Sequence, residues 1–195
     1  MPSGQRLEGK VAIVTGAGTR GEIPGTGQAA AILMAQEGAK ILLCDIDIER
    51  AEETLDVIEK DGGIGKIFIG DVTSEKDCES MINEAVKQFG KLDILVNNAG
   101  VTSRMMLLET SEPEWDRVMD INTKGTFLGI KTAIPAMKYS GGGSIVNISS
   151  QMGLVGADYI SPQYQASKGA VRIPVSYTHL RAHETPEHLV LRLVR

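Results

Sequence analysis

KVAIVTGAG (residues 10–18) and GTG (residues 25–27) are the stretches that decide the fold of this sequence. The apolar run Lys10–Thr15 predicts a buried strand, and the residues that follow the second stretch predict a helix over Gly27–Glu37. Glycines between a first strand and a first helix let backbone N–H groups approach a pyrophosphate at the helix N-terminus. A plain glycine-rich loop is the alternative interpretation. The first candidate cofactor-binding residues are therefore Gly16, Gly25, Thr26 and Gly27.

The same alternation continues outward along the chain, with short β-rich apolar runs between segments of helical periodicity. This order is typical of a parallel sheet covered by helices. With right-handed crossovers it predicts an α/β fold, namely a Rossmann-type, doubly wound parallel sheet in three α/β/α layers. We expect a single domain over residues 1–174, incomplete at its C-terminus. The further predicted strands are Lys40–Asp45, Lys66–Gly70, Leu92–Val96 and Ser144–Ile148. A helix is predicted over Glu49–Lys60 and another from Gln163 to about Pro174. Two more helices are predicted, one capped by Ser74 and one that starts at Ser111.

Composition and charge narrow the class of protein. The chain has 195 residues, 42% of them hydrophobic, and its 20 basic and 25 acidic side chains give a net charge of −5. This balance argues against a nucleic-acid binder or a protein of anionic membranes, which need a basic face. The sequence holds no apolar run long enough to span a membrane and no secretory signal at its start. Cys44 and Cys78 lack metal-ligand spacing, so we expect no metal site and two reduced structural thiols in a cytoplasmic protein.

Asp45 ends the second predicted strand, where a carboxylate can accept hydrogen bonds from the hydroxyl groups of an adenosine ribose. A carboxylate at this place also repels the 2′-phosphate of NADP. Arg20, in the glycine-rich loop, is a signal in the opposite direction, because an arginine can pair with that phosphate. The alternative for Asp45 is an ordinary strand-end or turn residue. We therefore expect NAD as the cofactor and NADP as the less favoured one.

Five motifs follow one another along the chain. They are Thr15-Gly16 with Gly25-Thr26-Gly27, Asp71-Val72, Asn97-Asn98-Ala99-Gly100, Asn147-Ile148-Ser149-Ser150 and Tyr164-Gln165-Ala166-Ser167-Lys168. In order and spacing they resemble the short-chain dehydrogenase/reductase family, over Leu7 to about Pro174. The Tyr-x-x-x-Lys pattern alone is common by chance, whereas the ordered set is not.

The resemblance implies a binding role for several of these residues. Asp71 and Val72 would hold the adenine, and Asn98 and Gly100 would line the adenosine and nicotinamide side of the site. Asn122, in a predicted helix, matches the asparagine that holds a water molecule in the family's proton relay. A helix-capping or kink-stabilising amide is the alternative for Asn122.

The resemblance also implies the catalytic residues. Tyr164 matches the family's acid/base, and Lys168 lies four residues on, so the two side chains share one helix face. A tyrosine has an ordinary pKa of about 10, and a neighbouring ammonium favours its ionised form. Lys168 would also hold the nicotinamide ribose, while Ser150, rather than the structural Ser149, would orient the substrate oxygen. An ordinary amphipathic helix face is the alternative for Tyr164 and Lys168.

These roles imply an NAD(P)-dependent oxidoreductase that interconverts a secondary alcohol and a ketone by hydride transfer. Its partners would be a small alcohol or ketone and, for the complete protein, further copies of itself in a dimer or a tetramer. A dinucleotide-binding fragment without turnover is the alternative function.

The chain departs from the family pattern at two internal places. The glycine loop is longer than the usual Gly-x-x-x-Gly-x-Gly, and we expect the inserted residues 20–24 to bulge without destroying the turn. The contacts of Gly18 and Gly21 with particular phosphates are left open for this reason. The segment from Ser150 to Tyr164 is one residue longer than usual, and Asp158-Tyr159-Ile160 is the expected place of the extra residue.

The third departure is the last segment, residues 175–195. It contains all 3 histidines, His179, His183 and His188, and it resembles a translated sequencing adapter rather than the family's continuation. We interpret it as a non-native tail, and a natural short C-terminus that continues the helix is the alternative. On this interpretation the sheet stops after its fifth strand, which leaves one edge and one apolar helix face uncovered.

Overall fold

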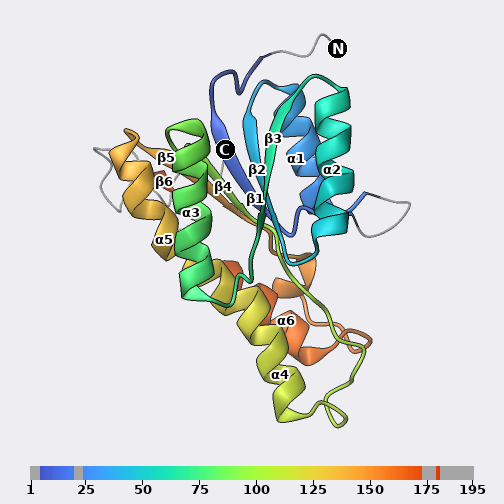
Figure 1. The fold of residues 1–195 in the computed structure, drawn as a ribbon. Helices are drawn as coiled ribbons and strands as arrows, with labels where there is room; N and C mark the ends of the chain where they lie inside the picture. The colour runs from blue at the N-terminus through green and yellow to red at the C-terminus, as the bar shows by residue number, and fades with distance from the viewer. Residues whose placement is uncertain (1–4, 20–23, 173–178, 181–195) are drawn as a thin grey trace.

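A computed structural model describes residues 5–19, 24–172 and 179–180 of the chain. Five of the described strands run parallel, in the order β3-β2-β1-β4-β5, and helices cover both faces of the sheet (Figure 1). The described elements are β1 (Val11–Thr15), α1 (Thr26–Gln36), β2 (Lys40–Asp45), α2 (Ile48–Lys60), β3 (Ile64–Ile69), α3 (Glu75–Phe89), β4 (Ile94–Asn97), α4 (Glu112–Met119), η1 (Asp120–Lys124), α5 (Gly125–Tyr139), β5 (Gly143–Asn147), η2 (Gln151–Gly153), α6 (Pro162–Arg172) and β6 (His179–Leu180). The predicted Rossmann-type architecture is confirmed.

Alternate residues of each strand pack on opposite faces of the sheet, as the two-residue period of a strand requires. In β1, Ala12 and Val14 face a core formed with α1 and α2. Ile13 faces the second core, which α3 and α5 complete on the other side. Because both faces are covered, β1 and β2 are buried along nearly their whole length, which explains their continuous apolar sequences.

The sheet has one strand more than the sequence predicted. β6 pairs antiparallel with β5, with Leu180 opposite Gly143 and His179 opposite Ser144. The expectation that the sheet stops after its fifth strand is therefore wrong. An edge strand offers unpaired N–H and C=O groups, so β5 provides a template for this short pairing. The remainder of the segment predicted to be a non-native tail, residues 175–178 and 181–195, lies outside the described residues, as do Arg20 and Gly21.

Local signals placed most helix ends correctly. Ser74 precedes α3 and its hydroxyl accepts a hydrogen bond from the Asp77 backbone N–H, the predicted cap. Gly38 follows α1 with a φ of +93°, a conformation that glycine adopts without a steric penalty. Four strand starts differ from the predicted ones by one or two residues, because β1, β3, β4 and β5 begin at Val11, Ile64, Ile94 and Gly143.

The helix predicted from Ser111 is interrupted by a π-helical segment. Ser111 caps α4 as expected, but η1 separates α4 from α5. Short π segments inside helices often occur at functional sites. This one carries Asn122, whose side chain is buried.

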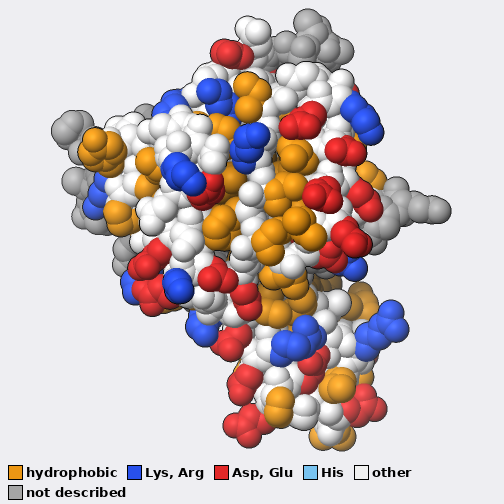
Figure 2. All heavy atoms as spheres, viewed as in Figure 1, with side chains coloured by type: hydrophobic (Ala, Val, Ile, Leu, Met, Phe, Trp, Pro, Cys, Tyr) orange, Lys and Arg blue, Asp and Glu red, His pale blue; other side chains and the backbone are white. Residues whose placement is uncertain are grey.

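The outer surface shows both signs of charge in close mixture (Figure 2). On this face, apolar side chains gather over the free edge of β3, where Ile64 and Ile69 are exposed. In the described part of the chain no helix is long and apolar enough to cross a membrane. No group of histidine, cysteine and acidic side chains suited to a metal ion occurs among these residues either.

Candidate active site

Two adjoining cavities lie at the carboxyl ends of the parallel strands, next to the point where the strand order reverses between β1 and β4. Ligands of open α/β sheets bind at such a switch point. The two cavities share Gly16, Gly100 and Val101. The larger, of about 360 Å³, is also lined by Gly18, Gly25, Thr26, Gly27, Asn98, Thr102, Ile148, Ser149, Tyr164 and Lys168. The smaller, of about 140 Å³, is also lined by Cys44, Asp45, Ile46, Gly70, Asp71, Val72, Ala99 and Ile121.

The glycine turn after β1 is shaped by close contacts. Gly16 has a φ of +62°, and a Cβ there would lie 2.8 Å from Ala99 Cα. A Cβ on Gly27 would overlap the Gly16 carbonyl oxygen and the Asn98 side-chain amide. Gly25 immediately precedes α1, and no side chain caps this end of the helix. No acidic residue lies in the first turn, and Gly25, Thr26 and Gly27 line the larger cavity. The N–H groups at the helix N-terminus can therefore bind an anion in this cavity. These residues fit a pyrophosphate.

Thr15 and Asn98 brace this turn against the end of β4. The Thr15 hydroxyl accepts hydrogen bonds from the backbone N–H groups of Asn98 (3.1 Å) and Ala99 (3.0 Å). The Asn98 side-chain amide donates to Thr15 O and to Gly16 O, both at 2.9 Å. The predicted binding residue Asn98 therefore lines the cavity and also holds the glycine turn. Sequence reasoning assigned no role to Thr15, although the residue was part of the quoted motif.

Asp45 lies at the end of β2 and ties it to the glycine turn. One carboxylate oxygen accepts a hydrogen bond from the Gly18 N–H (2.8 Å), and the other accepts from the N–H groups of Ile46 (2.8 Å) and Asp47 (3.2 Å). A carboxylate offers about four lone-pair sites, so acceptor capacity remains toward the smaller cavity. A Cβ on Gly18 would lie 2.9 Å from Asp45 Oδ2, which explains the glycine at that position.

Asp71 and Val72 line the smaller cavity together with Asp45, as the prediction of an adenosine site requires. The Asp71 side chain accepts a hydrogen bond from the Thr73 N–H at 2.8 Å, which fixes the turn after β3. Val72 packs against Gly125 of α5, where a Cβ would lie 2.8 Å from Val72 Cγ2. The apolar wall and the carboxylates thus come from the ends of two neighbouring strands.

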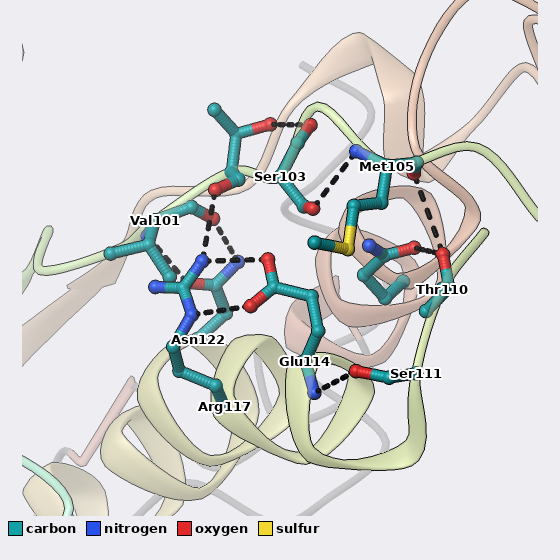
Figure 3. A network of polar contacts seen from close by, with 10 residues as sticks. Val101, Ser103, Met105, Thr110, Ser111, Glu114, Arg117 and Asn122 are labelled. Carbon is teal, nitrogen blue, oxygen red and sulfur yellow. Dashed lines mark hydrogen bonds and ion pairs between the residues drawn. The ribbon is translucent and has the colours of Figure 1, made fainter.

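Asn122 connects the helix to the loop after β4 (Figure 3). Its side-chain oxygen accepts from Val101 N–H at 2.8 Å, and its amide donates to Val101 O at 2.9 Å and to Ser167 Oγ at 2.8 Å. Ser167 in turn donates to the carbonyl of Tyr164 at 2.8 Å. Both amide hydrogens of Asn122 are therefore used inside the protein, in bonds to the loop after β4 and to α6 rather than to its own helix. Ser167 was a residue of the motif to which no role was given.

Tyr164 and Lys168 lie side by side in the wall of the larger cavity. Lys168 Nζ is 5.9 Å from the centre of the Tyr164 ring and donates to Ile148 O at 2.7 Å. Burial lowers the pKa of the Lys168 ammonium. Ser149 lines the cavity and donates to Lys168 O at 2.7 Å. Ser150 follows it, is half-buried, and accepts from the Met152 N–H at the start of η2.

The structure thus brings most of the predicted site residues to one place. All the predicted cofactor-binding residues line one or both cavities. Ser150 and Asn122 do not line either cavity, although Ser150 follows the lining residue Ser149 and Asn122 bonds the lining residue Val101. Cys44 and Cys78 are both buried and free.

The site has an open glycine turn at the switch point of a doubly wound sheet, and a tyrosine and a lysine four residues apart lie beyond it. This arrangement is typical of dinucleotide-binding α/β proteins. The sequence model of the short chain dehydrogenase family matches residues 10–190. The chain belongs to this family, whose members are oxidoreductases that bind NAD(P).

Individual relatives agree with this assignment. The chain is 45% identical over 150 residues to a Thermotoga maritima protein described as an uncharacterized oxidoreductase, covering 77% of this chain and 57% of that protein. It is 38% identical over 168 residues to a cyclopentanol dehydrogenase of a Comamonas species, covering 86% of this chain and 65% of that enzyme. A crystal structure of a short chain dehydrogenase from Mycobacterium smegmatis superposes with a TM-score of 0.81 at 30% identity, covering 87% of this chain and 70% of that one. The chain spans less than two thirds of the length of both curated relatives.

Proposed function

We propose that this chain carries the cofactor-binding and catalytic residues of an NAD-dependent oxidoreductase that interconverts a secondary alcohol and a ketone. The observation that carries the proposal is the placement of Tyr164 and Lys168 in the wall of the cavity that begins at the glycine turn. A site of this kind joins a dinucleotide cradle directly to a proton donor, which is what carbonyl reduction requires.

The residues present fit a nicotinamide dinucleotide. The cradle of Gly16, Gly25, Thr26 and Gly27 leaves room for a pyrophosphate because side chains are absent where the backbone closes. The smaller cavity, with its apolar and acidic walls, suits the adenosine half. When bound, the nicotinamide supplies the hydride.

The chain's own residues transfer the proton and orient the substrate oxygen. In ketone reduction the Tyr164 hydroxyl gives its proton to the substrate oxygen, and in alcohol oxidation the same oxygen accepts it. The Lys168 ammonium stabilises the negative charge left on Tyr164, and of its three N–H groups one is directed at Ile148 O, which leaves two for the tyrosine and a ribose. Ser150 orients the substrate oxygen. Asn122 takes part in the proton relay by holding the backbone at Val101 in place beside the cavity.

Asp45 supports NAD rather than NADP. Its carboxylate faces the adenosine end of the site with acceptor capacity to spare, and it would repel a 2′-phosphate. The Comamonas relative's description as a cyclopentanol dehydrogenase supports a secondary alcohol as the substrate class. We further propose a dimer or tetramer of the complete protein, as the family resemblance implies.

The proposal is tested by cofactor titration followed by turnover. NADH should bind more tightly than NADPH in a fluorescence titration, and the reverse order would refute the argument from Asp45. With cyclopentanol and NAD as the first substrate pair, Tyr164→Phe should lower kcat by at least a hundredfold. The matched control is Tyr139→Phe, because Tyr139 is exposed on α5 far from both cavities.

The second candidate function is a dinucleotide-binding protein without turnover. NADH binding without oxidation of any of a series of secondary alcohols would favour it. Turnover that survives Tyr164→Phe unchanged would refute the proposed mechanism instead.

A further inference from the structure

The wall of the larger cavity beside Tyr164 includes the segment that follows β4. Val101 and Thr102 both line this cavity. Asn122 holds the first of them at both its N–H and its carbonyl. Thr102, one residue further, offers its backbone carbonyl to helix α4.

Arg117 of α4 holds that carbonyl. Its Nη2 donates to Thr102 O at 3.3 Å. The same guanidinium is gripped by Glu114, with Nε to Oε2 at 2.8 Å and Nη2 to Oε1 at 2.9 Å. Within residues 5–19, 24–172 and 179–180, Arg117 is the only group that bonds the Thr102 carbonyl.

The pair of Arg117 and Glu114 can fix the position of the Thr102 backbone, but it contributes only modestly to the stability of the fold. The Arg117 side chain is 44% exposed, and the two residues are one helical turn apart on the outside of α4. Glu114 is only 17% exposed, but water at Arg117 screens the ion pair, so its contribution to stability is modest. A doubly bonded guanidinium, however, has a fixed plane, so its remaining donor is aimed at one place.

The pair is also permanently charged under ordinary conditions. Arg117, together with the Ser103 hydroxyl, lowers the pKa of Glu114 to about 2. The Glu114 carboxylate is therefore ionised at any pH near neutrality, and the ion pair with Arg117 persists there.

We propose that Arg117, held by Glu114, is a positioning residue that sets the place of Thr102 in the cavity wall and thereby the fit of the alcohol or ketone. The inference rests on the proposed function, because it takes the substrate to bind beside Tyr164. It adds a surface ion pair on α4 to the residues that shape the substrate end of the site.

The experiment compares Arg117→Met with Arg6→Met in the full chain. Arg6 forms a comparable exposed pair with Glu37, at 2.9 Å, at the start of the chain. With cyclopentanol and NAD, Arg117→Met should lower kcat/KM about tenfold, mainly through a higher KM, because a displaced wall misplaces the substrate. The NADH dissociation constant should stay within twofold, and Tm should fall by no more than about 3 °C. Arg6→Met should leave both kinetic constants within twofold.

A reversed pair separates positioning from a purely structural role. The double variant Glu114→Arg with Arg117→Glu keeps an ion pair on α4, but a glutamate at position 117 has no donor for Thr102 O. We expect its kcat/KM to remain as low as that of Arg117→Met. Arg117→Lys, which keeps a donor, should restore part of the loss.

Full recovery in the reversed pair, or unchanged kinetics in Arg117→Met, would overturn the positioning role while leaving the proposed function intact. Absence of turnover in the unmodified chain would instead refute the proposed function, and the positioning role with it. A tenfold loss in Arg117→Met that the reversed pair does not repair supports the inference.

Discussion

Gly27→Ala tests whether the glycine turn depends on close contact rather than on backbone freedom alone. Gly27 lies in the first turn of α1, where alanine is normally the better helix former. In this structure the added methyl group would overlap the Gly16 carbonyl oxygen and the Asn98 side-chain amide. Neither neighbour can move without loss, because Asn98 Nδ2 donates to Thr15 O and Gly16 O at 2.9 Å each.

The expected cost follows from those contacts. Each of the two amide hydrogen bonds is worth about 0.5–1.5 kcal/mol. Forcing a methyl group into a packed site costs about 1–3 kcal/mol. The helix propensity of alanine returns about 1 kcal/mol. The free energy of unfolding should therefore fall by about 1–5 kcal/mol, and NADH should bind at least tenfold more weakly because the N-terminus of α1 is displaced.

Two measurements check this expectation. Thermal unfolding of the chain without cofactor reports the change in the free energy of unfolding. Titration with NADH reports the change in cofactor affinity. The matched control is Gly169→Ala in α6, where a Cβ would be 3.7 Å from its nearest neighbour, Gly153 O. That variant should be neutral or up to about 1 kcal/mol more stable. Equal stabilities and equal NADH affinities for wild type and Gly27→Ala would refute the reasoning.

Three further substitutions test other parts of the site. Thr15→Val leaves the part-buried Ala99 N–H without its acceptor and the Asn98 N–H with Val96 O alone, so we expect about 1–3 kcal/mol of lost stability in denaturant titration; no loss would mean that the brace is unimportant. Gln165 holds the backbone of Ala157 and Ile160 through three hydrogen bonds of 2.7–2.8 Å, so Gln165→Met should speed chymotryptic cleavage at the exposed Tyr159, and an unchanged rate would contradict the clamp. The lowered pKa of Glu114, about 2 in the folded chain, implies a stabilisation that is present above its ordinary pKa and is lost as the pH falls through about 2. The Tm difference between wild type and Glu114→Gln should shrink over that range, and a difference independent of pH would refute the assignment.

Elements governed by local or strongly periodic signals could be predicted from the sequence. β2 has the predicted bounds, because a strand covered on both faces leaves a continuous apolar run. The starts of other strands depend on partners distant in sequence. Asp93 was expected within a strand, but its carboxylate accepts from the Val11 N–H at 2.9 Å and lies just before β4.

Many of the residues that line the two cavities could be predicted from the motifs, but several of their contacts could not. The motifs identified Asn98 and Asn122, and the structure shows what their amides hold. The contacts of Thr15 and Ser167 join segments that are 83 and 45 residues apart. No local pattern encodes such a pair, because it exists only after the sheet has assembled. The π segment around Asn122 and the pairing of β6 with β5 arise in the same way.

The end of β4 links the two halves of the site. Thr15 holds this segment at Asn98 and Ala99, from the side of the glycine turn. Asn122 of η1 holds it at Val101, and the same amide bonds Ser167 of α6. Gly100 lies between the two braces, and a Cβ there would be 3.2 Å from Asn122 Oδ1 and 3.4 Å from Lys168 Nζ. The distance from the glycine turn to Tyr164 is therefore set by one short segment with few large side chains that is held at both ends, which explains why its sequence combines two amides with small residues.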